Sequence, residues 1–222
     1  MLQSPMFAPE SDWSIPDIFP KFGDTERIAI DLETYDPHLL TSGPGWATNR
    51  GYMVGVGVAT KDWKGYFPIR HEGGGNLDEA VVLRWLQNTL SSTKREVIFH
   101  NALYDVGWLR REGVDVKGKI LDTMFAAPIV DENRYSYSLD TLGQTYCGEK
   151  KDESLLQDAA LAWGINPKAE MYKLHSKYVG PYGEQDAALT LKLYEKLRME
   201  LREQNLEPIY EMECKLIPLL LE

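Results

Sequence analysis

Residues 27–34, with the sequence RIAIDLET, constrain the fold of this chain more than any other stretch. Their apolar first half predicts a buried β-strand, and their second half carries two carboxylates, Asp31 and Glu33. Side chains two positions apart on a strand point to the same face, so these like charges repel each other. A divalent ion such as Mg²⁺ or Mn²⁺, which suits carboxylate oxygens, would offset the repulsion. The alternative is a strand end exposed to solvent, where acidic pairs are common.

The composition limits the classes of protein that need to be considered. The 222 residues, 43% of them hydrophobic, suffice for one large domain, alone or with appendages. No apolar run reaches the ~20 residues of a membrane span, and the N-terminus lacks the pattern of a secretory signal. Two cysteines without metal-site spacing favour a reducing compartment. The net charge of −10 argues against a stable duplex-DNA binder but is compatible with an enzyme that brings its own metal ions.

The spacing of apolar residues predicts an α/β fold. Four prolines in the first 20 residues indicate an extended N-terminal arm, and glycines and prolines indicate a long loop over residues 35–51. The first three strands are expected to form an antiparallel meander within a mixed sheet that has helices on both faces. Strands are predicted at residues 27–32, 53–60, 65–69, 96–99 and 119–121, and helices at 77–90, 102–112, 123–130, 138–146, 154–163, 167–175, 181–204 and from 208 onward.

The last long helix, predicted to begin at Pro181, carries a carboxylate on its core-facing stripe. Leucines recur at every fourth position over residues 189–201, and the same stripe continues backward through Asp186 and Tyr182. A carboxylate on such a face is costly unless it is paired or binds a cation. The alternative is a carboxylate near the first turn that the helix dipole stabilises.

The helix predicted after the strand at residues 96–99 repeats this arrangement. Asn101 and Asp105 are four residues apart, and Leu109 continues their row. Because the helix follows a buried strand directly, its N-terminal end should lie at the carboxyl edge of the sheet, where ligand sites form in α/β folds. Asn101 could instead be the helix N-cap and Asp105 a surface residue.

Four acidic side chains can therefore converge from one strand and two helices. Four carboxylates in one pocket cannot all stay ionised without cations, because like charges raise one another's pKa. Two divalent ions about 4 Å apart would satisfy this charge. Such sites catalyse in-line displacement at phosphorus, where one ion activates the attacking water and the other stabilises the leaving 3′-oxygen. The residues concerned are Asp31, Glu33, Asp105 and Asp186.

The order and spacing of these residues resemble the DEDD superfamily of 3′–5′ exonucleases, whose fold is ribonuclease-H-like. The spacing of Tyr182 and Asp186 is similar to the tyrosine subclass, since Pro181 occupies the position at which the histidine subclass has histidine. Over roughly residues 25–205 the chain is similar to the proofreading exonuclease domain of bacterial or phage family-A DNA polymerases. The similar stretches are HNALYDVGWLRREGV (100–114), ILDTMFAAPIVDENR (120–134), SLDTLGQTYCGEKK (138–151) and YGEQDAALTLKLYEKL (182–197).

The resemblance implies a role for each matching residue. The four acids would bind two divalent ions, Mg²⁺ or Mn²⁺, with Asp31 bridging both. Tyr182 would orient the attacking water together with Glu33. Leu32 and Thr34 would contact the terminal nucleotide, and Asn101 would hold the substrate near the scissile phosphate. The implied substrate is the 3′ end of single-stranded or frayed DNA, and the implied products are nucleoside 5′-monophosphates.

The resemblance also implies a domain arrangement and a setting. Residues 1–24 would be the N-terminal arm, residues 25–205 the exonuclease domain, and residues 206–222 a helix leading into a polymerase domain. The given sequence stops within the apolar pattern of that helix. This fits a helix cut from a longer polypeptide or a surface meant for a partner, and it equally fits a frayed terminal helix packed on its own domain. The implied setting is the cytoplasm of a bacterial host, with a polymerase as partner and no membrane.

Two other functions stay open on the sequence alone. One is trimming of RNA 3′ ends, because no residue that reads the 2′-hydroxyl can be named. The other is a catalytically idle domain that binds nucleic acid or braces a polymerase, although the intact acids count against it. Outside the acidic set, Asp122 is predicted to be a helix N-cap rather than a metal ligand, and Lys150 and Lys151 are predicted to be ordinary surface residues.

Overall fold

Five strands form one mixed sheet in the order β3-β2-β1-β4-β5. The protein structure is a computed structural model that describes residue 5 and residues 7–222, so part of the predicted N-terminal arm lies outside the described residues. The antiparallel pairs β1–β2 and β2–β3 and the parallel pairs β1–β4 and β4–β5 confirm the predicted combination of a meander with parallel strands. The strands are β1 (Ile28–Tyr35), β2 (Tyr52–Ala59), β3 (Lys64–Pro68), β4 (Glu96–Phe99) and β5 (Lys119–Asp122).

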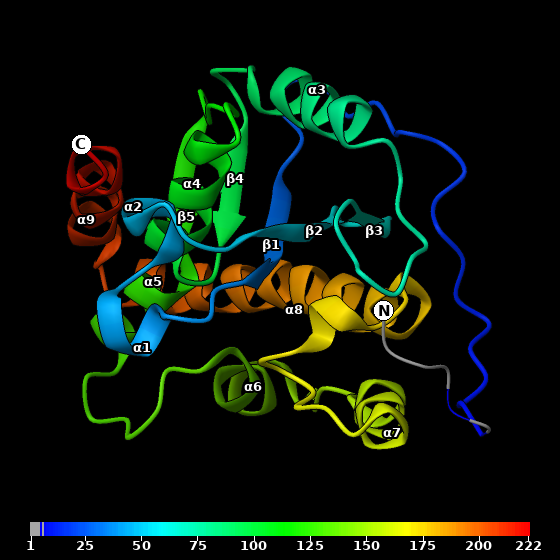
Figure 1. The fold of residues 1–222 in the computed structure, drawn as a ribbon. Coiled ribbons are helices and arrows are strands. Elements are labelled where there is room, and N and C mark those ends of the chain that lie inside the picture. The colour runs from blue at the N-terminus through cyan, green and yellow to red at the C-terminus, as the bar shows by residue number, and fades with distance from the viewer. Residues whose placement is uncertain (1–4, 6) are drawn as a thin grey trace.

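Helices cover both faces of this sheet, as predicted (Figure 1). The long helix α8 (Ser176–Glu203) crosses β1, β2 and β3 on one face, where Tyr66 of β3 packs against Gly183. The next residue of β3, Phe67, points to the other face and contacts Trp85 of α3 (Glu79–Leu90), with ring centroids 4.4 Å apart. α4 (Ala102–Arg111) lies on that second face as well, where its Tyr104 hydroxyl bonds Thr34 of β1 at 2.7 Å.

The remaining helical segments are shorter, and two differ from the prediction. The loop expected over residues 35–51 contains two single-turn helices. The prediction of a helix over residues 167–175 is wrong, because only one 3₁₀ turn forms there. The Asn166 side chain accepts the N–H groups of Lys168 and Ala169, and this local turn competes with a helix. The segments are α1 (Leu39–Ser42), α2 (Gly45–Thr48), α5 (Thr123–Val130), α6 (Leu139–Leu142) with a π-turn at Gly143–Cys147, α7 (Ser154–Trp163), the 3₁₀ turn Met171–Lys173 and α9 (Glu207–Leu220).

The start of α8 also corrects the prediction, because the helix begins at Ser176 and continues through Pro181. Proline has no N–H for the carbonyl four residues earlier, which here is that of Lys177. The Ser11 hydroxyl in the N-terminal arm donates to this carbonyl at 2.8 Å. The arm therefore satisfies the acceptor that Pro181 leaves free, and α8 gains the turn that precedes the candidate site.

The described part of the arm contains no helix or strand and packs along the sheet and α8 through aromatic side chains. The indole N–H of Trp13 donates to Glu184 at 2.8 Å, and Phe19 stacks on Phe67 with centroids 5.4 Å apart. These contacts attach the arm to both α8 and β3.

α9 closes the β5 edge of the sheet (Figure 1). Its Tyr210, Cys214 and Ile217 are buried, and the Tyr210 hydroxyl accepts the Asp122 N–H at 3.0 Å. Ile209 is among its apolar residues that remain exposed. None of the described helices is both long enough and apolar enough to cross a membrane.

Candidate active site

The candidate site forms where β1 separates from β4. The ladder between these parallel strands has only the pairs Ile28–Val97 and Ala29–Ile98, whereas β1 continues to pair with β2 on its other side. Beyond the ladder, the Leu32 N–H donates to the Asp105 side chain of α4 at 3.0 Å instead of to a strand. A side chain from α4 thus enters at the carboxyl edge of the sheet, where open α/β sheets place their ligands.

Two glycines of β2 lie opposite the acids of β1 in the strand pairing. Asp31 pairs with Gly57, and Gly55 occupies the corresponding position opposite the next acid. A β-carbon at Gly57 would lie 2.2 Å from the backbone oxygen of Gly183, a distance that real side chains do not adopt. α8 can therefore approach the sheet closely one turn before it presents Asp186. The alternating glycines of β2 were a sequence signal for this approach.

Asp31, Glu33 and Asp186 form what we call the acid cluster. Each contributes a carboxylate oxygen, and these atoms lie within 4.8 Å of one another. Glu33 and Asp186 are buried, at 7% and 4% exposure, and Asp31 is half-buried. Asp105 is not part of this group, because one of its oxygens is turned to the Leu32 N–H. The structure therefore brings three of the four predicted acids together and places the fourth beside them.

The carboxylates of the site are held in an environment that disfavours their charge. Burial, and then the neighbouring charge of Asp186, raises the pKa of Asp31 to about 7. Burial together with Asp31 raises the pKa of both Glu33 and Asp105 well above the usual range. Burial also raises the pKa of Asp186, although the Lys151 ammonium opposes this shift. Binding of a cation would lower the free energy of such a site, because it offsets the repulsion between the carboxylates.

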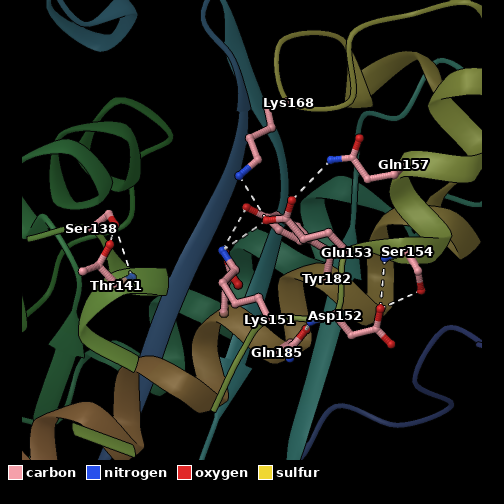
Figure 2. Close-up of polar contacts among 11 residues, drawn as sticks. Ser138, Thr141, Lys151, Asp152, Glu153, Ser154, Gln157, Lys168, Tyr182 and Gln185 are labelled. Carbon is pink, nitrogen blue, oxygen red and sulfur yellow. Dashed lines mark hydrogen bonds and ion pairs between the residues drawn. The ribbon is translucent and has the colours of Figure 1, made fainter. Parts of the chain in front are cut away.

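Lys151 corrects a prediction, because it is a buried residue of the site rather than a surface residue. Its ammonium lies 2.6 Å from Asp186 Oδ2, and both side chains are nearly inaccessible, at 7% and 6% exposure. It also donates to the Tyr182 hydroxyl at 3.3 Å and lies 4.6 Å from the centre of that ring. Its neighbour Lys150 is exposed, as predicted. Figure 2 shows Lys151 and Tyr182 among the polar contacts of this region.

Tyr182 lies one turn before Asp186 on α8, as the sequence predicted, and is buried at 8% exposure. Burial and the charges of Glu33, Asp186 and Asp31 raise its pKa far above the usual range. In this environment the phenol stays neutral and can donate or accept a hydrogen bond.

The three predicted substrate-binding residues occupy different positions. Leu32 is buried, with its backbone N–H held by Asp105. The Thr34 side chain points to the face opposite the acid cluster, where it bonds Tyr104. Asn101 is exposed at the start of α4 in a left-handed conformation, with φ of 76°, and its side chain makes no capping hydrogen bond. Of the three side chains, that of Asn101 is therefore the freest to meet a ligand.

Asp122 is the helix N-cap that the sequence predicted. Its carboxylate accepts the N–H of Met124 at 2.8 Å, at the start of α5. It also accepts the N–H groups of Asn101 and Ala102, at 3.0 and 2.8 Å. One buried carboxylate thus anchors two helices, including the one that presents Asp105, and has no role in the acid cluster.

The donor set of the acid cluster fits a hard divalent ion. Its ligand atoms are carboxylate oxygens, which Mg²⁺ and Mn²⁺ prefer. Asp186 Oδ1 is buried and has no hydrogen-bond partner among the described residues. A buried carboxylate oxygen without a partner is costly, so this atom is available to ligate an ion.

Residues 15–202 match the family model of the 3′–5′ exonuclease of DNA polymerase A type. The chain belongs to this exonuclease family. It is 37% identical over 226 residues to a DNA-directed DNA polymerase of Pseudomonas phage M6, covering 99% of this chain and 34% of the relative. It is 27% identical over 212 residues to DNA polymerase DpoZ of Salmonella phage PMBT28, covering 92% and 31%. The chain thus spans about a third of the length of these relatives, and the predicted family is confirmed.

The fold is also similar to that of a solved exonuclease-family structure. Escherichia coli RNase D, an exoribonuclease involved in structured RNA processing, matches with a TM-score of 0.59 at 15% sequence identity, over 88% of this chain and 45% of that one. At this identity the match concerns the fold alone, and it confirms the predicted ribonuclease-H-like architecture.

Proposed function

We propose that this chain is a metal-dependent 3′–5′ exonuclease that removes nucleotides from the 3′ end of single-stranded or frayed DNA and releases nucleoside 5′-monophosphates. The observation that carries the proposal is the acid cluster, which combines two acids of β1 with Asp186, and Asp186 and Tyr182 are presented by the same helix. Relatives that are DNA polymerases support DNA as the substrate. A polymerase domain or subunit as partner, and the cytoplasm of a bacterial host as location, are part of the same proposal.

The chain supplies four carboxylates that would hold two Mg²⁺ or Mn²⁺ ions: the acid cluster and Asp105. Bound there, such ions would neutralise the phosphate and make water a better nucleophile near neutral pH. Glu33 and Tyr182 would orient that water, since the neutral phenol offers a hydrogen bond and the carboxylate accepts one. Asp105 also accepts the backbone N–H of Leu32, which lies between the two acids of β1, and so ties α4 to this strand.

The residues proposed to hold the substrate act in different ways. Asn101, exposed at the start of α4, would bond the strand near the scissile phosphate. The backbone of Leu32 and Thr34 would contact the terminal nucleotide, because the Thr34 hydroxyl is already engaged by Tyr104. The net charge of −10 means that affinity for the strand would come from these few contacts and the bound ions rather than from a basic surface.

A cleavage assay with a 5′-labelled DNA oligonucleotide and Mn²⁺ tests this proposal. The wild type should give a ladder of shortened products, and Asp186→Asn should lower the rate by roughly 10³-fold or more, because a ligand of the reacting centre is lost. Asp158→Asn, which changes an exposed acid of α7, is the matched control and should cleave like the wild type. Equal cleavage by the wild type and Asp186→Asn would show that the site is wrongly assigned.

RNA is the second candidate substrate, and the fold that this chain shares with RNase D favours testing it. DNA and RNA oligonucleotides of the same sequence, compared at equal Mn²⁺ concentration, separate the two. Faster shortening of RNA would move the substrate assignment but keep the site. If neither oligonucleotide is shortened and calorimetry detects no Mn²⁺ binding, the chain is an idle domain and the proposal fails.

A further inference from the structure

Among the described residues, Lys151 is the cation that forms an ion pair with the acid cluster, and it pairs with one carboxylate in particular. Its ammonium lies 2.6 Å from Asp186 Oδ2 but 3.9 Å from Glu153. Glu153 already has its own partner, because Lys168 approaches it at 3.0 Å. Figure 2 shows this arrangement, with Glu153 between the two lysines. The charge of Lys151 is therefore directed mainly at Asp186.

The segment that carries Lys151 is fixed to α8 at three points. It lies between the π-turn and α7 and has no regular secondary structure. The Lys192 ammonium binds Glu149 at 2.7 Å, and Gln185 accepts the Asp152 N–H at 3.0 Å. Together with the contact of Lys151 to Asp186, these ties keep the ammonium next to the cluster without a helix or strand to position it.

The cluster has more negative charge than Lys151 can balance. Three carboxylates share the site with one buried ammonium, so an ionised cluster keeps an excess of negative charge. A divalent ion that binds Asp186 must share or take over the carboxylate that the ammonium holds. The ammonium and the ion are attracted by the same carboxylate group and repel each other across it, so their binding is mutually unfavourable.

We propose that Lys151 is a positioning residue that serves as the internal counter-cation of the acid cluster: it holds Asp186 in place when no ion is bound, and it competes with divalent ions for that carboxylate. This inference rests on the proposed metal site and adds to it a residue that sets the affinity of the site. Lys151 would keep the carboxylates together in the ion-free protein, and the same charge would lower the affinity of the site for a divalent ion.

The test is a calorimetric Mn²⁺ titration of the full chain, combined with thermal unfolding in EDTA and in saturating Mn²⁺. Lys151→Met keeps the length of the side chain and removes its charge. It should bind Mn²⁺ about tenfold more tightly than the wild type, within the usual range for coupled binding events. In EDTA its Tm should fall by about 3–6 °C, because Asp186 then lacks a partner, and Mn²⁺ should restore most of this loss.

Two further variants give the comparison its controls. Lys150→Met removes the adjacent exposed charge and should leave both the Mn²⁺ affinity and the Tm in EDTA unchanged. Lys151→Arg keeps the charge and should hold the Mn²⁺ affinity within about twofold of the wild type. If Lys151→Met does not fold in EDTA, folding in Mn²⁺ still supports the proposal, and failure to fold in either buffer overturns it in favour of a packing role.

The result that overturns the inference differs from the one that overturns the proposed function. If the wild type binds Mn²⁺ and Lys151→Met binds it equally or more weakly, Lys151 is not a competitor, and the exonuclease proposal stands on its own assay. If neither protein binds Mn²⁺, the metal site itself is wrong and both proposals fail. A loss of stability in EDTA and Mn²⁺ alike, with unchanged affinity, would show a purely structural lysine.

Discussion

Two groups of charged side chains in this molecule differ in how completely their charges are paired. In the first, Arg70 binds Glu79 at 2.7 Å and Glu112 at 2.5 Å, and it donates to the Met53 carbonyl at 3.2 Å. A guanidinium has five N–H donors in a planar fork, so it can hydrogen-bond two carboxylates and a carbonyl at the same time. In the second, the acid cluster, one ammonium from Lys151 faces three carboxylates. In the first group one guanidinium is hydrogen-bonded to both carboxylates, whereas in the second a single ammonium pairs directly with only one of three carboxylates.

The pKa values of one carboxylate in each group, Glu79 and Asp31, shift in opposite directions. The hydrogen bond from Arg70 lowers the pKa of Glu79, so this carboxylate contributes stability above its usual pKa that is lost as the pH falls. Burial raises the pKa of Asp31 to about 7, so its charge opposes folding at neutral pH. The Arg70–Glu79 pair therefore stabilises the fold, whereas the ionised acid cluster reduces stability, and Lys151 or a bound cation would offset part of this cost. Opposition of this kind is expected where a site is kept for function.

The largest effect on stability should come from breaking the Arg70 group. Arg70→Met leaves the half-buried Glu112 without its partner and should lower the free energy of unfolding by about 2–3 kcal/mol. The Mn²⁺ affinity should not change, since Arg70 does not contact the acid cluster. Urea denaturation and calorimetric titration measure the two quantities. A weakened Mn²⁺ affinity would show that the Arg70 group and the acid cluster are energetically coupled.

A smaller effect of opposite sign is expected from the acid cluster. Asp31 keeps its proton to about pH 7 in the folded protein but only to about pH 4 when unfolded, so the folded state binds more protons between these values and stability falls as the pH rises through this window. The full shift corresponds to about 4 kcal/mol, and we expect about half of it to remain after the protein and solvent relax around the buried charge, so Asp31→Asn should raise the free energy of unfolding in EDTA at pH 8 by about 2 kcal/mol. In Mn²⁺ the same variant should lose cleavage. At pH 4 the gain should vanish. A less stable variant at pH 8 would mean that the Asp31 charge supports the fold.

The smallest effect is expected from an exposed ion pair, which calibrates the other two. Lys117 and Asp115 approach to 2.9 Å, but both side chains are more than half exposed. Lys117→Met should shift the Tm by less than about 2 °C, because solvent screens such pairs. Differential scanning calorimetry at low and high salt would detect any larger contribution, and a larger one would show that exposure is a poor guide to these charges.

Local periodicity accounts for the part of the candidate site that the sequence could predict. Asp31 and Glu33 share a face because a strand repeats every two residues, and Tyr182 and Asp186 share one because a helix repeats every 3.6. The cap at Asp122 was predictable for the same reason, since its partner Met124 is two residues away. These rules need only neighbouring residues, so they hold before the fold is known.

The contacts that the sequence did not show join residues far apart in the chain. Lys151 meets Asp186 from 35 residues away, in a segment with no periodic pattern that could indicate its direction. The Ser11 hydroxyl donates to the Lys177 carbonyl, which Pro181 leaves without a helical partner, across a separation of 166 residues. Without knowledge of this contact, Pro181 indicated that the helix begins there. Both contacts depend on how irregular segments pack, which the spacing of apolar residues does not specify.

The glycine contact between β2 and α8 has a consequence for the size of any ion that the site accepts. Because a β-carbon at Gly57 would lie 2.2 Å from Gly183, even the smallest side chain would push the helix away from the sheet and Asp186 away from Asp31. Mg²⁺ requires oxygens at about 2.0–2.1 Å, whereas Ca²⁺ accepts about 2.3–2.6 Å with more variable geometry. The choice between ions of different radius would thus depend on the close contact of Gly57 with Gly183, and not only on the identity of the carboxylates.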